Sequence, residues 1–227
     1  MCWALEFDFS ALGAMLGGIG GLVAGIAGGF LAYFAYQGLS AWKKQVRAGR
    51  VIESGEALLK AIYEANGVLD YVLEPFVHAS ELEKVSRDNG ESESDFRRRQ
   101  PFQAIANRYR EHEEVFNRLR TACFHAKAVL GDDVYQAATK VHRFPDHIFK
   151  AAKSVLSAEA ELERMELRAA SRGVNPEVWD AVFKKVEMAS SYFYGSMDGK
   201  DLSNELAELI SAAEVLIRTS IDRAFKN

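Results

Sequence analysis

Residues 11–37 read ALGAMLGGIGGLVAGIAGGFLAYFAYQ and contain no charged side chain. At about 1.5 Å per residue, a helix of this length crosses a hydrocarbon layer of about 30 Å with some tilt. The stretch therefore predicts a transmembrane helix. It divides the chain into a short N-terminal end at residues 1–10, the span at 11–37 and a large remainder at 38–227.

The predicted span carries glycines at a strict spacing of four residues. They are Gly13, Gly17, Gly21, Gly25 and Gly29. Glycine weakens a helix and gains nothing from lipid, so a continuous strip of small residues is typical of a place where another helix backbone approaches closely. We expect the chain to form a homo-oligomer through this glycine strip. A dimer and a closed head-to-tail ring both fit the pattern. A conducting pore is less favoured, because no charged residue lines the span.

The charges on either side of the span predict its orientation. The first ten residues contain Glu6 and Asp8 but no lysine or arginine, whereas Lys43, Lys44 and Arg47 follow the span together with Trp42. Lysine and arginine near a span concentrate on its cytoplasmic side, and tryptophan concentrates at the interface. We therefore expect the N-terminus outside, residues 42–47 at the inner interface and residues 38–227 in the cytoplasm.

The remainder of the chain repeats apolar side chains at steps of three and four, which is typical of amphipathic helices. We expect the span to continue into a first cytoplasmic helix that ends by Pro75. Residues 78–100 are polar and rich in turn formers, and they predict a mobile loop. Pro101 is then expected to open a long helix with a heptad stripe from Phe102 to Leu130, which Gly131 ends.

Further helices are expected from about residue 132 to 141, from 146 to 172, from 176 to 193 and from 202 to 221. Asn175 and Pro176 form a typical helix start, with a capping side chain and a proline at the first helical position. No segment alternates with a period of two over a useful length, so no sheet is expected. The fold class predicted is all-α, with one transmembrane helix that continues into a cytoplasmic helical bundle.

The composition excludes several classes of function. The net charge is −4, so no global basic field attracts nucleic acid, which would need a local basic patch. Cys2 and Cys123 lie on opposite sides of the span and cannot pair within one chain, and no Cys or His group has the spacing of a zinc site. No phosphate-binding loop or nucleophile elbow occurs. We expect no cofactor and no metal.

One short pattern points to catalysis. Arg120 and His125 are separated by four residues, and this spacing resembles that of HEPN-type ribonucleases, which are small helical bundles. The resemblance implies that arginine polarises a phosphate while histidine moves protons across a dimer. A chain with this many arginines yields about one such match by chance. The alternative is that both residues are solvent-facing neighbours of the heptad stripe, and a non-enzymatic protein is favoured.

Three other groups of residues invite a functional interpretation that we disfavour. His112 occupies a position of the heptad stripe, where a histidine bonded to a neighbour at the edge of the core is the favoured explanation over a pH-sensitive joint. His142 and His147 flank Pro145 without a second pair of ligands. The basic run at residues 97–99 follows Glu91, Glu93 and Asp95, which predicts local neutralisation rather than binding of lipid headgroups or RNA.

The layout as a whole resembles a group of uncharacterised bacterial single-span proteins. The resemblance rests on Trp42-Lys43-Lys44-Gln45, the helix from Ala57 to Ala65, Pro75-Phe76, the stripe from Phe102 to Leu130 and the run from Phe149 to Leu156. It implies an inner (plasma) membrane location and no activity. A thinner similarity, in architecture and in the Arg120 to His125 spacing, is to the membrane-anchored HEPN-like accessory protein of type VI-B CRISPR systems, which assembles as a membrane ring.

Three hypotheses of function follow. The first is a non-enzymatic membrane protein that assembles through the glycine strip as a scaffold or pore-like effector. The second is a membrane-tethered HEPN-like ribonuclease that uses Arg120 and His125. The third is an adaptor that docks a cytoplasmic protein partner at the lipid bilayer.

Overall fold

The structure is a computed structural model that describes residues 9–74, 76–173, 175–195 and 201–226, without the side chains of residues 9–24, 171, 172 and 226. Eight helices and no strand occur in these ranges: α1 (Phe9–Val72), α2 (Ala79–Glu83), α3 (Glu93–Glu111), α4 (Glu113–Leu130), α5 (Asp132–His142), α6 (Phe144–Arg172), α7 (Pro176–Tyr194) and α8 (Leu202–Lys226). The predicted all-α fold is confirmed. The chain divides into two compact units, residues 1–49 with 227 and residues 50–226.

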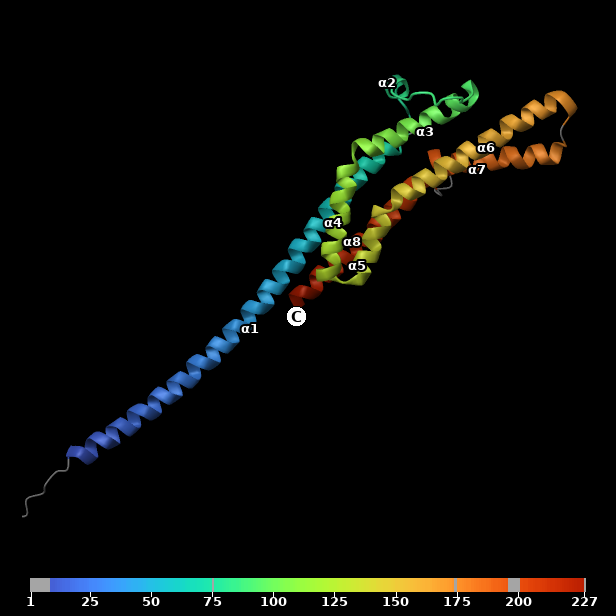
Figure 1. The fold of residues 1–227 in the computed structure, drawn as a ribbon. Helices are drawn as coiled ribbons and strands as arrows, with labels where there is room; N and C mark the ends of the chain where they lie inside the picture. Colours follow the sequence, from blue (N-terminus) through green and yellow to red (C-terminus); the bar gives the residue numbers. More distant parts are fainter. Residues whose placement is uncertain (1–8, 75, 174, 196–200, 227) are drawn as a thin grey trace, which may run out of the picture. The chain divides into compact units, whose positions relative to one another are not determined.

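The second unit is built from amphipathic helices around one core. Leu58, Ile62 and Leu69 of α1 pack in it with the buried stripes of α4, α6 and α8, which include Phe116, Leu119, Phe144, Ile148, Leu206 and Ile217. Helices α6 and α7 contact each other along their length (Figure 1). Each buried aliphatic or aromatic side chain contributes about 1.5–3 kcal/mol. Burial of these apolar stripes therefore fixes the positions of the helices that carry the polar side chains of the second unit.

A glycine lets α1 and α8 approach closely. A Cβ atom placed on Gly55 would lie 2.6 Å from Cδ1 and 2.9 Å from Cγ1 of Ile221. These distances are shorter than van der Waals contact, so any larger residue forces the two helices apart or moves the isoleucine. Gly55 thus permits the core contact between α1 and α8.

The heptad stripe predicted from Phe102 to Leu130 divides into two helices. Phe102, Ile105, Phe116 and Leu119 are buried as expected. His112, however, ends α3 and caps α4 with φ −116° and ψ 18°, a non-helical conformation. Its ring lies edge-on to the Tyr71 ring at 5.9 Å.

Two boundaries differ from the prediction. Residues 78–100, predicted as a mobile loop, contain α2 and the first two turns of α3. Pro101 lies inside α3 instead of opening a helix. The Ser92 side chain begins α3 by accepting a hydrogen bond from the Asp95 amide at 3.1 Å, a capping interaction that replaces apolar periodicity as the local cause of the helix.

Within the described residues, no helix is long and apolar enough to cross a membrane. In the first half of the predicted span, up to residue 24, the structure does not describe the side chains.

Candidate functional site

The first unit presents a long run of exposed apolar side chains. From Gly25 to Arg47 every described residue of α1 is exposed. Phe30 is 60% exposed, Leu31 71% and Tyr36 73%. Scattered apolar residues are normal on a protein surface, but a contiguous run of this kind marks a surface that something else covers.

The polar groups within this run bond to the helix itself. The Ser40 hydroxyl donates to the Gln37 carbonyl at 2.8 Å, and the Gln37 amide donates to the Tyr33 hydroxyl. The Trp42 ring is 59% exposed, and Lys43, Lys44 and Arg47 are exposed after it.

The glycine strip is only partly described. A Cβ atom on Gly25 or Gly29 would meet nothing within 4 Å. Gly13, Gly17 and Gly21 belong to the part of α1 whose surroundings the structure does not describe. The described part of the strip is therefore open along its helix.

Arg120 and His125 lie on different sides of α4. Residues five apart on a helix are rotated by about 140°. The Arg120 guanidinium lies 5.9 Å from the centroid of the Phe124 ring, and burial, followed by the charge of Arg120, lowers the pKa of His142 in α5. His125 instead places Nδ1 3.2 Å from the Ser54 hydroxyl of α1. A single chain does not bring these two side chains together.

His125 opens onto a groove between α1 and α4. The groove has a volume of about 740 Å³ and is lined by Ser54, Ala57, Glu114, Asn117, Arg118, Thr121, Ala122 and His125. Arg118 is the cation in it, and its Nη2 atom lies 3.4 Å from a carboxylate oxygen of Glu64. A hydroxyl, an imidazole and a guanidinium therefore share one open surface, although Arg120 is not part of it.

Arg108 forms the most complete polar site of the second unit, and the sequence did not predict it. The side chain is 1% exposed. Its Nε and Nη2 atoms each donate to the Glu81 carboxylate at 2.7 Å. The remaining donors reach the carbonyls of Tyr71 at 3.1 Å, Glu74 at 3.0 Å and Phe76 at 2.6 Å.

This site joins the end of α1, the first turn of α2 and the last turn of α3. The guanidinium supplies a donor for each of these partners, which include the carbonyl of Tyr71 in the last turn of α1 and those of Glu74 and Phe76 in the segment after it. The hydrogen bonds from Arg108 lower the pKa of Glu81 to about 2. The one signal of this site in the sequence is that Arg108 directly precedes Tyr109, which occupies a position of the heptad stripe.

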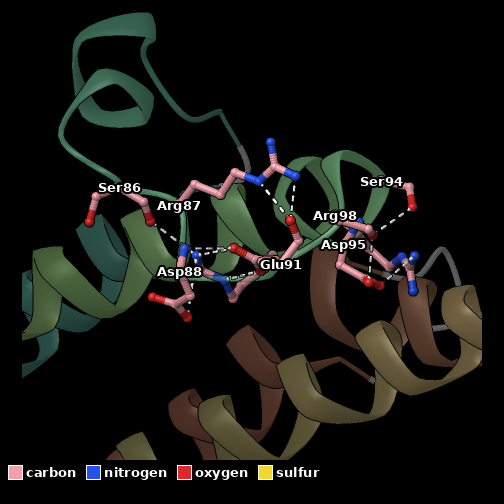
Figure 2. A network of polar contacts seen from close by, with 9 residues as sticks. Ser86, Arg87, Asp88, Glu91, Ser94, Asp95 and Arg98 are labelled. Atoms are coloured by element: carbon pink, nitrogen blue, oxygen red, sulfur yellow. Dashed lines mark hydrogen bonds and ion pairs between the residues drawn. The ribbon is translucent and has the colours of Figure 1, made fainter.

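The basic run at residues 97–99 is neutralised by carboxylates. Arg97 pairs with Glu93 at 2.9 Å, and Arg99 pairs with Glu91 at 2.7 Å. Arg98 pairs with Asp95 at 3.2 Å (Figure 2) and also with Glu163. Arg87 donates to the Glu91 carbonyl, which ties the preceding turn to the same network. Local neutralisation, as the sequence predicted, is confirmed for these three arginines.

The remaining titratable candidates occupy structural positions. His147 contacts one oxygen of Glu205 at 3.1 Å, and the Tyr192 hydroxyl donates to the other at 2.6 Å, so one carboxylate links α6, α7 and α8. Burial, followed by this carboxylate, raises the pKa of Tyr192 to about 12. Burial raises the pKa of Cys123 to about 11, which leaves it an inert thiol at neutral pH. Cys2 lies outside the described residues.

No group of three or more metal-ligating side chains occurs in the described ranges. No family model matches the chain, and no match is found among curated proteins or solved structures. The two family resemblances therefore stay predictions.

Proposed function

We propose that the chain is a membrane-anchored, non-enzymatic protein, held in the bacterial inner membrane by residues 11–37 with its helical bundle in the cytoplasm. The exposed apolar run from Gly25 to Trp42, which contains no charged residue, is the observation that carries this proposal. Side chains such as Leu31 and Tyr36 gain about 25 cal/mol for each Å² removed from water. A helix that is apolar on all sides is typical of a membrane span.

The polar details of this segment support the same proposal. Ser40 and Gln37 bond within the helix, which is how polar groups are satisfied where water is absent. Lys43, Lys44 and Arg47 follow at the end of the apolar run, and Trp42 precedes them, an order that fits the inner interface of a bilayer.

We further propose that the protein self-assembles through the glycine strip as a scaffold or pore-like effector. The open surroundings of Gly25 and Gly29 leave room for a second helix backbone. Substitution of Gly21 and Gly25 by leucine should reduce the oligomeric mass in detergent or nanodiscs while the far-ultraviolet circular dichroism stays unchanged.

Gly38→Leu is the matched control, because Gly38 also has open surroundings but lies off the strip. It should leave the mass unchanged. An unchanged oligomeric mass in the Gly21→Leu/Gly25→Leu variant would contradict the assembly proposal. A purely monomeric wild-type protein would do the same.

The groove at His125 supports a second candidate function, a membrane-tethered HEPN-like ribonuclease. Ser54 orients His125, and Arg118 lies in the same groove. RNA cleavage by the purified protein should then disappear in His125→Ala. Parallel Arg118→Ala and Arg120→Ala variants decide which arginine assists, and an RNA that stays intact with the wild-type oligomer rejects this candidate.

A third candidate is an adaptor that docks a soluble partner at the membrane. It is distinguished from a pore by co-purification of a partner without ion flux across liposomes.

A further inference from the structure

One side of α7 carries an apolar strip outside the core. Trp179, Phe183 and Val186 follow one another at steps of four and three, the spacing of a helix-packing seam. Phe183 is 54% exposed, and Trp179 and Val186 are half-buried. Val182, on the adjacent side, is 6% exposed and belongs to the buried face of the helix. We call Trp179, Phe183 and Val186 the α7 strip.

The strip continues a surface on which a helix already lies. At the C-terminal end of α7, the Phe102 ring of α3 packs against Phe193 at 5.5 Å and Tyr194 at 6.4 Å between centroids. Steps of four from Tyr194 lead through Ser190 to Val186, so the strip lies on the same side of α7 as Tyr194.

Helix α3 does not cover the strip. It begins at Glu93, and the α6–α7 hairpin continues beyond that start (Figure 1). Arg98 of α3 pairs with Glu163 of α6, and Lys185 of α7 pairs with Glu161 two residues away, so α3 reaches the level of the strip along the hairpin. Phe183 is nevertheless 54% exposed, so α3 leaves this ring open to solvent. The strip therefore offers a seat for a further helix beside α3.

The edges of this seat are acidic. Glu166 follows Glu163 on α6, and Asp180 and Glu187 stand one turn before and after Phe183 on α7. All three carboxylates are exposed, and among the described residues none of them forms an ion pair. Lys184 is also exposed there, whereas Lys185 is paired with Glu161 at 2.6 Å.

We propose that the α7 strip binds a basic amphipathic helix of a partner protein. The occupied part of the same surface already holds a basic helix, since Arg98 of α3 pairs with Glu163 while Phe102 packs on Phe193. A second helix with an apolar stripe and lysine or arginine beside it would repeat this pattern on Phe183, Asp180 and Glu187. Two copies of the strip facing each other would bring carboxylates against carboxylates. An anionic membrane surface would likewise repel these carboxylates.

The proposal deepens the adaptor candidate and rests on it, independently of the glycine strip. The test uses the full chain in detergent and a fluorescent synthetic helix of leucine and lysine, with binding followed by anisotropy. A matched peptide with glutamate in place of lysine should not bind. Higher salt should weaken binding, because the flanking charges are exposed.

Variants locate the binding surface. Phe183→Lys and the double variant Asp180→Lys/Glu187→Lys should each lower the affinity about tenfold or more, as for the central residues of an interface. Met188→Lys is the matched control, since Met188 is 59% exposed on another side of α7, and it should leave the affinity unchanged. Circular dichroism melts confirm that each variant folds.

The outcomes separate this proposal from membrane assembly. Gly21→Leu/Gly25→Leu should leave peptide binding intact, and Phe183→Lys should leave the oligomeric mass intact. The proposal is overturned if the lysine peptide does not bind, if it binds equally to Phe183→Lys, or if Phe183→Lys instead changes the oligomeric mass, which would identify a second copy as the occupant.

Discussion

Arg108 holds three segments of the second unit together through a single buried guanidinium. Its partners include the Glu81 carboxylate, the Tyr71 carbonyl at the end of α1 and the Glu74 carbonyl just beyond that helix. Lysine keeps the charge but has neither the planar fork nor enough donors for these partners. The buried carbonyls would then lose hydrogen bonds that water cannot replace.

We therefore predict that Arg108→Lys lowers the free energy of unfolding by about 3 kcal/mol or more, measured by urea denaturation. The control is Arg110→Lys, because Arg110 is exposed and donates a hydrogen bond to Asn107 within the same helix. That change should stay within about 0.5 kcal/mol. Equal effects of the two substitutions would show that the buried network contributes nothing specific.

Gly55 sets the distance between α1 and α8, and a methyl group is enough to test it. Gly55→Ala should lower the free energy of unfolding by about 1–3 kcal/mol, because its Cβ atom would overlap Ile221. Gly67→Ala, on the same helix with nothing within 4 Å, should raise it by up to about 1 kcal/mol through helix propensity. Thermal melts of both variants make the comparison, and a stabilised Gly55→Ala protein would contradict close packing at this position.

At the scale of elements, α2 depends on the ion pair between Glu81 and Arg108. Hydrogen bonds from Arg108 lower the pKa of Glu81 from its ordinary value of 4.5 to about 2. A carboxyl whose pKa is lower in the folded state adds stability above the unfolded pKa. That stability is lost as the pH falls from about 4.5 toward 2.

We predict that Glu81→Gln destabilises the protein at pH 7 and that the difference from wild type shrinks as the pH falls through this window. Urea denaturation at a series of pH values measures it. Glu83→Gln, an exposed substitution on the same helix, should retain the acid dependence of the wild type. A Glu81→Gln protein that loses stability in parallel with wild type would rule out Glu81 as a source of that dependence.

The amphipathic helices were predictable from the sequence because one physical cause dominates them. Leu58, Phe116 and Ile217 are buried where the steps of three and four placed them. Residues 78–100 were mispredicted because short-range polar contacts form that segment. The Ser92 cap and the Arg99 to Glu91 pair leave no apolar period in the sequence.

Sites made by distant residues were beyond the sequence for a related reason. Arg108 and Glu81 are separated by 27 positions, and Ser54 and His125 by 71. No short sequence motif indicates either pair. The Arg120 to His125 spacing is visible in the sequence, yet its helical rotation places the two side chains apart, so a local pattern alone did not define a site.

At the scale of the whole molecule, an exposed apolar segment has to be covered by lipid or by protein. Lipid requires only that the segment be apolar on all sides, whereas a protein partner would cover one face of the helix. From Ile26 to Tyr36 large apolar side chains occupy most of the circumference of α1, and glycine and alanine occupy the rest. This distribution favours lipid as the covering medium and leaves the glycine strip as the helix-contacting part.

We predict that Ile26→Arg combined with Phe30→Arg releases the protein from membranes, because each arginine deep in a span costs about 2.5–3.5 kcal/mol on insertion scales. Vesicle flotation and alkaline extraction measure the membrane-bound fraction. Val46→Arg is the control, since it adds an arginine beside Lys43 and Arg47, where the inner interface is proposed, and it should leave the protein membrane-bound. If protein rather than lipid covers the segment, the membrane-bound fraction of the double variant would equal that of the wild type while its oligomeric mass changed. That result would reject residues 11–37 as a membrane anchor.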